Sequence, residues 1–265
     1  MAHIELEVIT KGPSGSPRPT PLVFIHGGWH GAWCWEHFQS YLAEQGYQSH
    51  ALSLRGHGAS SGRERLRCSS AADFLSDLDQ VVRQLPDPPV LIGHSLGGYL
   101  IQKYLESRTA AAAVLLASVP PRGLFMVLHR LTLRRPWQAL KMHATREPFV
   151  FIETPKRVRE VLFSANIAPE MFDRYLARLQ PESYRVGWDA SVFRIPRPRK
   201  VHRGPMLVMG AEKDALITTD EVRATAAAYG TRAEIVPGMA HDMMLESGWQ
   251  NVAARIAEWL REKGF

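Results

Sequence analysis

The sequence has only two cysteines, Cys34 and Cys68, among 265 residues. Two cysteines so far apart cannot build a disulfide framework or a cysteine-rich zinc site, so we expect both to be reduced thiols. No run of apolar residues is long enough for a membrane-spanning helix, and residues 1–10 have neither the basic start nor the apolar core of a secretory leader. We therefore expect a cytoplasmic chain without stable membrane insertion.

Internal repeats and low-complexity tracts are also missing, and a length of 265 residues suits one sizeable domain with room for an insertion. The net charge of +6 is unevenly placed, because residues 120–204 hold 17 Lys and Arg against 7 Asp and Glu. The densest basic part, residues 194–203, could attract an anionic ligand, nucleic acid or acidic lipid. We favour a solvated, proline-stiffened segment that returns the chain to its core, and we expect no nucleic-acid partner.

Short apolar runs alternate with longer amphipathic segments, which predicts a mostly parallel sheet flanked by helices. Strands are predicted at residues 3–9, 22–25, 48–52, 90–92, 113–117, 206–210 and 233–236. Helices are predicted at residues 33–45, 70–85 and 96–107, and Ser70 with Asp73 is typical of a helix start. A closing amphipathic helix is predicted from apolar residues on one face, namely Trp249, Val252, Ala253, Ile256 and Leu260.

The alternation of strands and helices stops near residue 120 and resumes near residue 204. Between these points the sequence predicts only helical segments broken by prolines, at residues 124–133, 136–144, 155–163, 169–179 and 181–190. We therefore predict an α/β core formed by residues 1–119 and 204–265. A helical insertion over residues 120–203 would interrupt this core.

The most informative motif is Gly93-His94-Ser95-Leu96-Gly97, which follows the apolar run at residues 90–92 and opens directly onto a helix. A turn this tight between a strand and a helix forces the serine into a strained backbone conformation, and the glycines allow close backbone approach. The motif predicts that Ser95 is a nucleophile. Because five-residue patterns of this kind are common, the prediction depends on partner residues elsewhere in the chain.

A serine nucleophile needs a histidine to take its proton and a carboxylate to orient that histidine. Asp214 follows the strand predicted at residues 206–210, and His241 follows the strand predicted at residues 233–236. Since the carboxyl ends of parallel strands share one edge of a sheet, we expect Ser95, Asp214 and His241 to converge there. Residues of the same types remain alternatives: His26, His57, Glu212 and Asp242.

The order of Ser95, Asp214 and His241 resembles the α/β-hydrolase superfamily, as do the motifs His26-Gly27-Gly28 and Arg55-Gly56-His57-Gly58. The resemblance covers nearly the whole chain and implies an α/β-hydrolase fold in which the helical insertion is the cap or lid. Residues 26–33 and 239–244 are most similar to small esterases and lipase-like hydrolases near the methyl-ester esterase and hydroxynitrile lyase branch. One departure is Ser53, which stands where many relatives have an aspartate.

The resemblance also implies an oxyanion hole formed by the backbone N–H groups of Gly28 and Leu96. Such donors stabilise the negative oxygen of a tetrahedral intermediate. The implied activity is that of a serine carboxylesterase, which cleaves an ester, thioester or lactone through an acyl-enzyme. The alternatives are a carbon–carbon bond hydrolase, a hydroxynitrile-lyase-like enzyme and a non-catalytic ligand-binding homologue. A resemblance to the dehalogenase and epoxide hydrolase branches would imply an aspartate at the nucleophile position. Because position 95 is a serine, those two chemistries are disfavoured.

The substrate is the least determined part of this hypothesis. Apolar residues near the predicted site indicate an apolar pocket or, equally, simple core packing: Trp29, Tyr99, Phe125 and Leu128. We expect a small, largely apolar ester or thioester, and the basic insertion leaves an anionic thioester open. We expect no cofactor and no metal, because His26 and His30 have no third ligand nearby. The sequence does not predict the oligomeric state.

Overall fold

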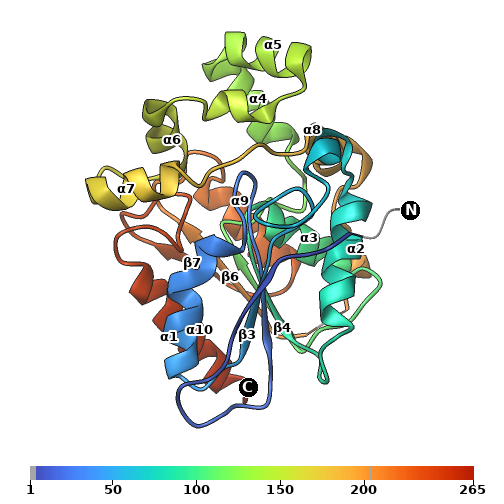
Figure 1. Ribbon diagram of the computed structural model, residues 1–265, viewed down its shortest axis with the longest axis vertical. Helices are drawn as coiled ribbons and strands as arrows, with labels where there is room; N and C mark the ends of the chain where they lie inside the picture. The colour runs from blue at the N-terminus through green and yellow to red at the C-terminus, as the bar shows by residue number, and fades with distance from the viewer. Residues whose placement is uncertain (1–3, 203) are drawn as a thin grey trace.

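The computed structural model describes residues 4–202 and 204–265, which build a seven-stranded sheet in the order β1-β3-β2-β4-β5-β6-β7 (Figure 1). Only β1 is antiparallel to its neighbour, β3, and the other pairs are parallel. The strands are β1 (Val8–Lys11), β2 (Leu22–Ile25), β3 (Ser49–Leu52), β4 (Val90–His94), β5 (Ala112–Leu116), β6 (Met206–Ala211) and β7 (Ala233–Val236). Residues of β2, β4 and β5 are all buried, as expected for parallel strands covered on both faces. The predicted α/β class is confirmed.

Helices cover both faces of the sheet (Figure 1). On one face α1 (Glu36–Glu44) packs against α10 (Trp249–Glu262), and on the other α2 (Ala71–Val82) packs against α3 (Leu96–Tyr104). Helix α2 begins at the predicted cap, where the Ser70 hydroxyl accepts the Asp73 amide and the Asp73 carboxylate accepts the Ser70 amide. Helix α9 (Thr219–Ala228) packs on β6 and β7 and was not among the predicted helices.

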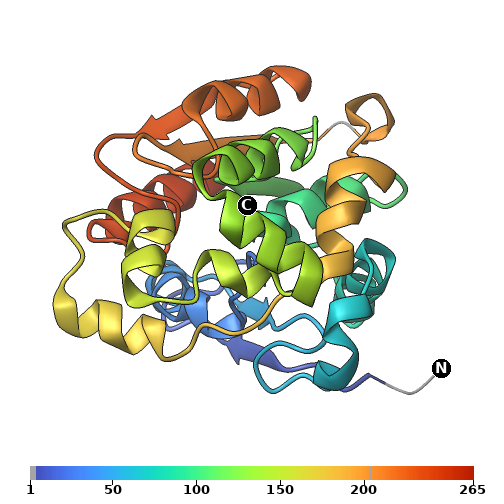
Figure 2. The ribbon, with the colours of Figure 1, turned by 90° about the horizontal axis from the view of Figure 1, so that it is seen from above.

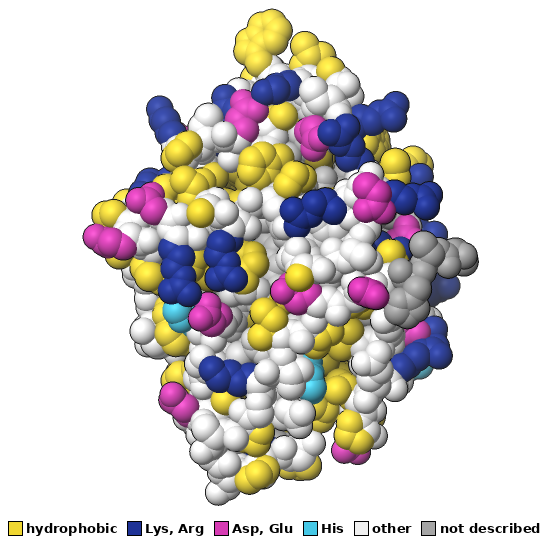
Figure 3. Space-filling model, viewed as in Figure 1, with side chains coloured by type: hydrophobic (Ala, Val, Ile, Leu, Met, Phe, Trp, Pro, Cys, Tyr) yellow, Lys and Arg dark blue, Asp and Glu magenta, His cyan; other side chains and the backbone are white. Residues whose placement is uncertain are grey.

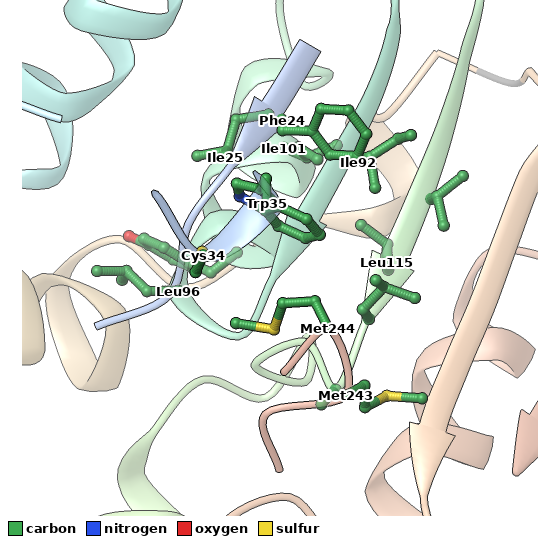
Figure 4. Close-up of a cluster of buried hydrophobic side chains, with 14 of the residues drawn as sticks. Phe24, Ile25, Cys34, Trp35, Ile92, Leu96, Ile101, Leu115, Met243 and Met244 are labelled. Atoms are coloured by element: carbon green, nitrogen blue, oxygen red, sulfur yellow. The ribbon is translucent and has the colours of Figure 1, made fainter. Parts of the chain in front are cut away.

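The core anchors the loops that follow the strands. Figure 4 shows side chains of β2, β4 and β5 meeting Trp35 on one side and Met243 and Met244 on another. Burying each such side chain stabilises the fold by about 1.5–3 kcal/mol. Met243 and Met244 come just after His241 and are fully buried. Their burial therefore holds the loop that carries this histidine against the sheet.

Between β5 and β6 the chain forms a set of helices that lies at one end of the molecule (Figures 1 and 2). These are α4 (Phe125–Arg134), α5 (Pro136–Thr145), α6 (Pro155–Leu162), α7 (Pro169–Leu176) and α8 (Tyr184–Trp188). Proline is the first residue of α5, α6 and α7, where its missing N–H costs no hydrogen bond. We call residues 120–202 the inserted segment.

Short helical turns connect several of these elements, and most of them were not predicted from periodicity. They are the 3-10 turns Ala32–Trp35, Arg63–Cys68, Pro148–Phe151 and Pro198–Lys200 and the π-helical turn Asp189–Phe193. Within residues 4–202 and 204–265, no helix has both the length and the apolar character needed to cross a membrane.

The strand predicted at residues 3–9 is wrong over residues 4–7, and His3 lies outside the described residues. The backbone amides of Glu5 and Glu7 donate to the hydroxyls of Ser61 and Ser60, at 3.0 Å and 2.8 Å, instead of to a neighbouring strand. The alternating residues 4–7 therefore lie alongside the loop after β3 and bond to its serines, instead of forming part of a strand. Strand pairing begins only at Val8.

Residues 194–202, the basic end of the inserted segment, are hydrogen-bonded to α3 and to Glu106, which follows α3. The backbone carbonyl of Arg194 accepts the Tyr99 hydroxyl at 3.0 Å, and the Arg197 amide donates to Glu106 at 2.7 Å. This agrees with a segment that leads the chain back to the core. Arg203, the last basic residue of this run, lies outside the described residues.

Candidate active site

Ser95 lies on the turn between β4 and α3 in a strained conformation. Its φ of 50° and ψ of −110° are rarely adopted by residues other than glycine. The Ser95 amide donates to the Leu116 carbonyl at 3.0 Å, which holds the turn against β5. A Cβ at Gly93 would lie 2.6 Å from the backbone of Gly97, and a Cβ at Gly97 would overlap the carbonyl of Ile25. The two glycines therefore permit the turn that the motif predicts.

Asp214 and His241 meet beyond the ends of β6 and β7, as predicted. Oδ2 of Asp214 accepts a hydrogen bond from His241 Nδ1 at 2.8 Å. Oδ1 accepts the backbone amides of Leu216 and Ile217 at 2.8 Å and 2.9 Å. Because the carboxylate accepts the Nδ1 hydrogen, the neutral ring has its lone pair at Nε2. His241 and Ser95 line the same cavity.

The charges around His241 favour its protonated form. Burial by itself lowers the pKa of His241, but the charge of Asp214, its hydrogen bond and the charge of Asp242 outweigh burial, so the pKa is raised. A base with a raised pKa holds an abstracted proton more firmly. The arrangement suits a group that takes a proton from a nearby hydroxyl.

Two of the alternative candidates for the base and the carboxylate, His26 and Glu212, form hydrogen bonds with backbone groups of other loops. His26 Nδ1 donates to the Gly27 carbonyl at 2.7 Å, and its Nε2 accepts the Leu54 amide at 3.1 Å. Burial, followed by the charge of His57, places the pKa of His26 well below its ordinary value. Glu212 accepts the Gly238 amide at 2.7 Å. His26 therefore links two loops, and Glu212 supports the turn after β7.

Asp242 supports the site by binding His30, which in turn binds the turn at Gly28, a role that the sequence reasoning missed. Its Oδ2 accepts His30 Nε2 at 3.0 Å, and His30 Nδ1 donates to the Gly28 carbonyl at 2.7 Å. Although burial raises the pKa of Asp242, the charge of His30, its hydrogen bond and the charges of His94 and His241 together outweigh burial and lower that pKa. The pair joins the turn at Gly28 to the loop at His241. Only the buried position of the three residues in the tertiary structure reveals this link.

His94, inside the predicted turn, also supports the histidine loop. Its Nε2 donates to the His241 carbonyl at 3.0 Å, and burial lowers its pKa to about 3. Possible metal-ligating atoms of His94, His241 and Asp242 lie within 4.8 Å of one another. Hydrogen bonds to protein groups occupy Nε2 of His94, Nδ1 of His241 and Oδ2 of Asp242, while Nδ1 of His94 and Oδ1 of Asp242 have no hydrogen-bond partner among the described residues. The geometry is that of a hydrogen-bonded network.

Gly28 and Leu96, predicted as oxyanion-hole residues, both line the cavity that Ser95 and His241 share. Leu96 is the first residue of α3, so its amide lies at the positive end of the helix dipole. Gly28 belongs to a turn that ends at Trp29, which has a φ of 68°. Amide donors from two separate loops thus border one cavity.

The cavity has a volume of about 350 Å³ and mostly apolar walls. Trp29, Phe125 and Leu128 line it, but the placement of Tyr99 there is wrong. Tyr99 is fully buried in the core, where its hydroxyl donates to the Arg194 carbonyl at 3.0 Å. Glu182, which sequence reasoning missed, is the one residue with a carboxylate among the described residues that line the cavity.

The departure at Ser53 is compensated by a carboxylate from another part of the chain. The Ser53 hydroxyl accepts the Ala32 amide at 2.8 Å and donates to Glu7 Oε2 at 2.5 Å. The same oxygen of Glu7 accepts the Ala59 amide at 3.2 Å. Glu7 thus supports the loop that follows β3 through its bonds to Ser53 and Ala59.

The chain belongs to the alpha/beta hydrolase family, whose model matches residues 22–255. Among curated proteins it is 28% identical over 134 residues to methylesterase 3 of Arabidopsis thaliana, an alignment that covers 47% of this chain and 51% of that protein. It is 34% identical over 117 residues to "Probable esterase PIR7A" of Oryza sativa subsp. indica, which covers 40% of this chain and 41% of that protein. The matched parts are thus about half of these relatives or less.

Solved structures share the fold over nearly the whole chain. A monoacylglycerol lipase of Paleococcus ferrophilus matches with a TM-score of 0.72 and 22% identity over 98% of this chain and 99% of that chain. An esterase of Thermogutta terrifontis matches with a TM-score of 0.73 and 20% identity over 98% and 94%. At these identities the likeness shows the fold.

Proposed function

We propose that this chain is a serine ester hydrolase with Ser95 as nucleophile, His241 as base and Asp214 as the carboxylate that orients the base. One observation carries the proposal: a strained Ser95 and a His241 bound to Asp214 at 2.8 Å line one cavity. A serine with a strained backbone that shares a cavity with a histidine bound to a carboxylate suits nucleophilic catalysis. The similarity to proteins named as esterases supports the same activity.

The proposed reaction has two steps. In the first step Ser95 Oγ attacks the ester carbonyl carbon, His241 Nε2 takes the hydroxyl proton, and the amides of Gly28 and Leu96 stabilise the resulting oxyanion. The tetrahedral intermediate then releases the alcohol, which receives the proton from His241. In the second step water attacks the acyl-enzyme with His241 again as base, which yields the carboxylic acid and free Ser95.

The cavity favours a small and largely apolar substrate. Its walls are mostly hydrophobic, and its volume of about 350 Å³ lies near the lower end of the range for small-molecule sites. Glu182 places a buried carboxylate next to Gly28, with Oε2 3.5 Å from where a Gly28 Cβ would stand. The same oxygen lies 3.3 Å from His57 Nε2, and the mostly apolar wall around it disfavours a charged acyl group. We therefore propose a neutral acyl group, and residues 120–203 as the cap that closes over it.

The test is labelling and turnover by a matched pair of variants. Native protein should react with a fluorophosphonate probe and release p-nitrophenol from p-nitrophenyl acetate in a burst, and Ser95→Ala should do neither. Ser107→Ala, which removes an exposed hydroxyl outside the cavity, should behave like the native protein. Native protein that resists the probe would refute the proposal. Labelling without turnover of esters of any acyl length would instead indicate carbon–carbon or cyanohydrin cleavage.

A further inference from the structure

The inserted segment exposes an unusual amount of apolar surface. Nine large hydrophobic side chains are exposed in the described residues, and eight of them lie between residues 125 and 193. Trp137 is 76% exposed, Leu133 is 70% exposed and Leu140 is 60% exposed. Figure 3 shows hydrophobic side chains projecting at the end of the molecule where Figure 1 places α4 and α5. Large exposed apolar side chains gathered at one end of a molecule in this way indicate an interaction site.

The exposed side chains belong to helices that already have a packed face. Val127 and Leu131 of α4 and Met142 of α5 are buried and line the cavity. Leu133, Trp137 and Leu140 of the same two helices are exposed instead, so packing within this chain does not explain them. We call the exposed set Met126, Leu133, Trp137 and Leu140, none of which lines the cavity, the outer apolar face.

Basic residues without an acidic partner among the described residues flank, in sequence, the two helices that carry the outer apolar face. Arg122 precedes α4, Arg134 ends it, and Arg146 follows α5; all three are exposed and form no ion pair with the described residues. The three acidic residues between positions 122 and 160 are already paired, Glu147 with Arg67, Glu160 with Arg135, and Glu153 with Lys141 and Arg157. The unpaired charge around this face is therefore positive.

From these observations we propose that the outer apolar face binds the surface of an anionic lipid bilayer. Exposed tryptophan and leucine on helices insert at the level of the lipid headgroups, while arginines beside them contact lipid phosphates. A symmetric dimer through the same face would bring copies of Arg134 and Arg146 close to one another. Charge complementarity thus favours the lipid surface over a second copy of this chain. Bound in this way, α4 and α5 would separate the cavity from the bilayer.

Vesicle sedimentation tests the proposal without reference to catalysis. Native protein should sediment with vesicles of phosphatidylcholine and phosphatidylglycerol, more weakly with phosphatidylcholine alone, and more weakly again in high salt. Trp137→Glu should reduce the affinity for the anionic vesicles by about tenfold or more. Arg134→Gln should reduce it by about fivefold. Ile9→Glu is the matched control, because Ile9 is exposed but lies in β1, and its affinity should equal that of the native protein.

Three results would overturn the proposal. Native protein could fail to sediment with anionic vesicles, or Trp137→Glu could bind as tightly as Ile9→Glu. Light scattering could also show a dimer that Trp137→Glu dissociates, which would assign the face to self-association. Since Trp137 does not line the cavity, none of these results depends on whether Ser95 is the nucleophile.

Discussion

The substitution Asp214→Asn tests the proposed role of the carboxylate most directly. In the native protein Oδ1 accepts two backbone amides and Oδ2 accepts His241 Nδ1. The oxygen of asparagine must take the Oδ1 position, because only an acceptor satisfies the amides of Leu216 and Ile217. Its NH₂ group then faces Nδ1 as a donor. His241 must turn its lone pair to Nδ1 and carry its hydrogen on Nε2, where it can no longer accept the Ser95 proton.

The expected loss is large. Unit charges 2.8 Å apart interact by about 6 kcal/mol at an effective dielectric constant of about 20, which measures how strongly Asp214 stabilises protonated His241. Since about 1.4 kcal/mol corresponds to a tenfold change in rate, the value corresponds to about 10⁴-fold. Serine hydrolases with a histidine held in the wrong tautomer lose a similar factor.

The assay is burst and steady-state hydrolysis of p-nitrophenyl acetate, with thermal unfolding to show that the variant is folded. Glu212→Gln is the matched control, because its side chain can still accept the Gly238 amide and it does not contact His241. The control should keep its activity within about twofold of native. An Asp214→Asn variant within tenfold of the native rate would refute the proposed orienting role.

Two further predictions concern the base and the turn. The pKa of His241 is raised, so kcat/KM should fall as the pH decreases, with a midpoint above 6.5. Asp242→Asn should lower this midpoint, because it removes a negative charge that raises the pKa of His241. An unchanged midpoint in the variant would contradict this electrostatic role of Asp242. In thermal unfolding Gly97→Ala should destabilise the fold by about 3 kcal/mol or more, because its Cβ would overlap backbone of β2. Gly187→Ala, in α8 with open space around it, should instead stabilise the fold by up to about 1 kcal/mol, and equal effects would contradict the packing argument.

Local chemistry explains why much of the fold was predictable. The strand at Leu22–Ile25 has the predicted bounds, because a run of four apolar residues between turn residues is too short for a helix and is fully buried as a strand. The strand at Ala233–Val236 also has the predicted bounds, although its residues are only partly buried. The start of α2 at Ser70 follows from one side chain and one amide three residues apart. By contrast α9 was missed, although Thr218 and Glu221 form the same kind of cap. The apolar residues of α9 are mostly alanines, so the helix has only a weak hydrophobic periodicity in the sequence.

Sequence alone predicts the class of fold, which the structure confirms, and it predicts Asp214 and His241, which the structure joins by a hydrogen bond. The third predicted residue, Ser95, lines the same cavity as His241. A motif with glycines at Gly93 and Gly97 specifies a turn, and chain order in a parallel sheet brings Asp214 and His241 to the same edge. These inferences need only local geometry and the direction of the strands. They do not depend on which side chains pack against one another.

The residues that surround the site, and those that face outward, become known only when the packing of the whole chain is seen. Tyr99 is in the core, Glu182 enters the cavity, and Glu7 replaces the carboxylate missing at position 53. Asp242 and His30 are 212 residues apart in sequence and meet in the interior. Such pairings depend on how helices and loops distant in sequence pack together. For the same reason, the periodicity of α4 and α5 predicted helices but not the exposed apolar face that they form.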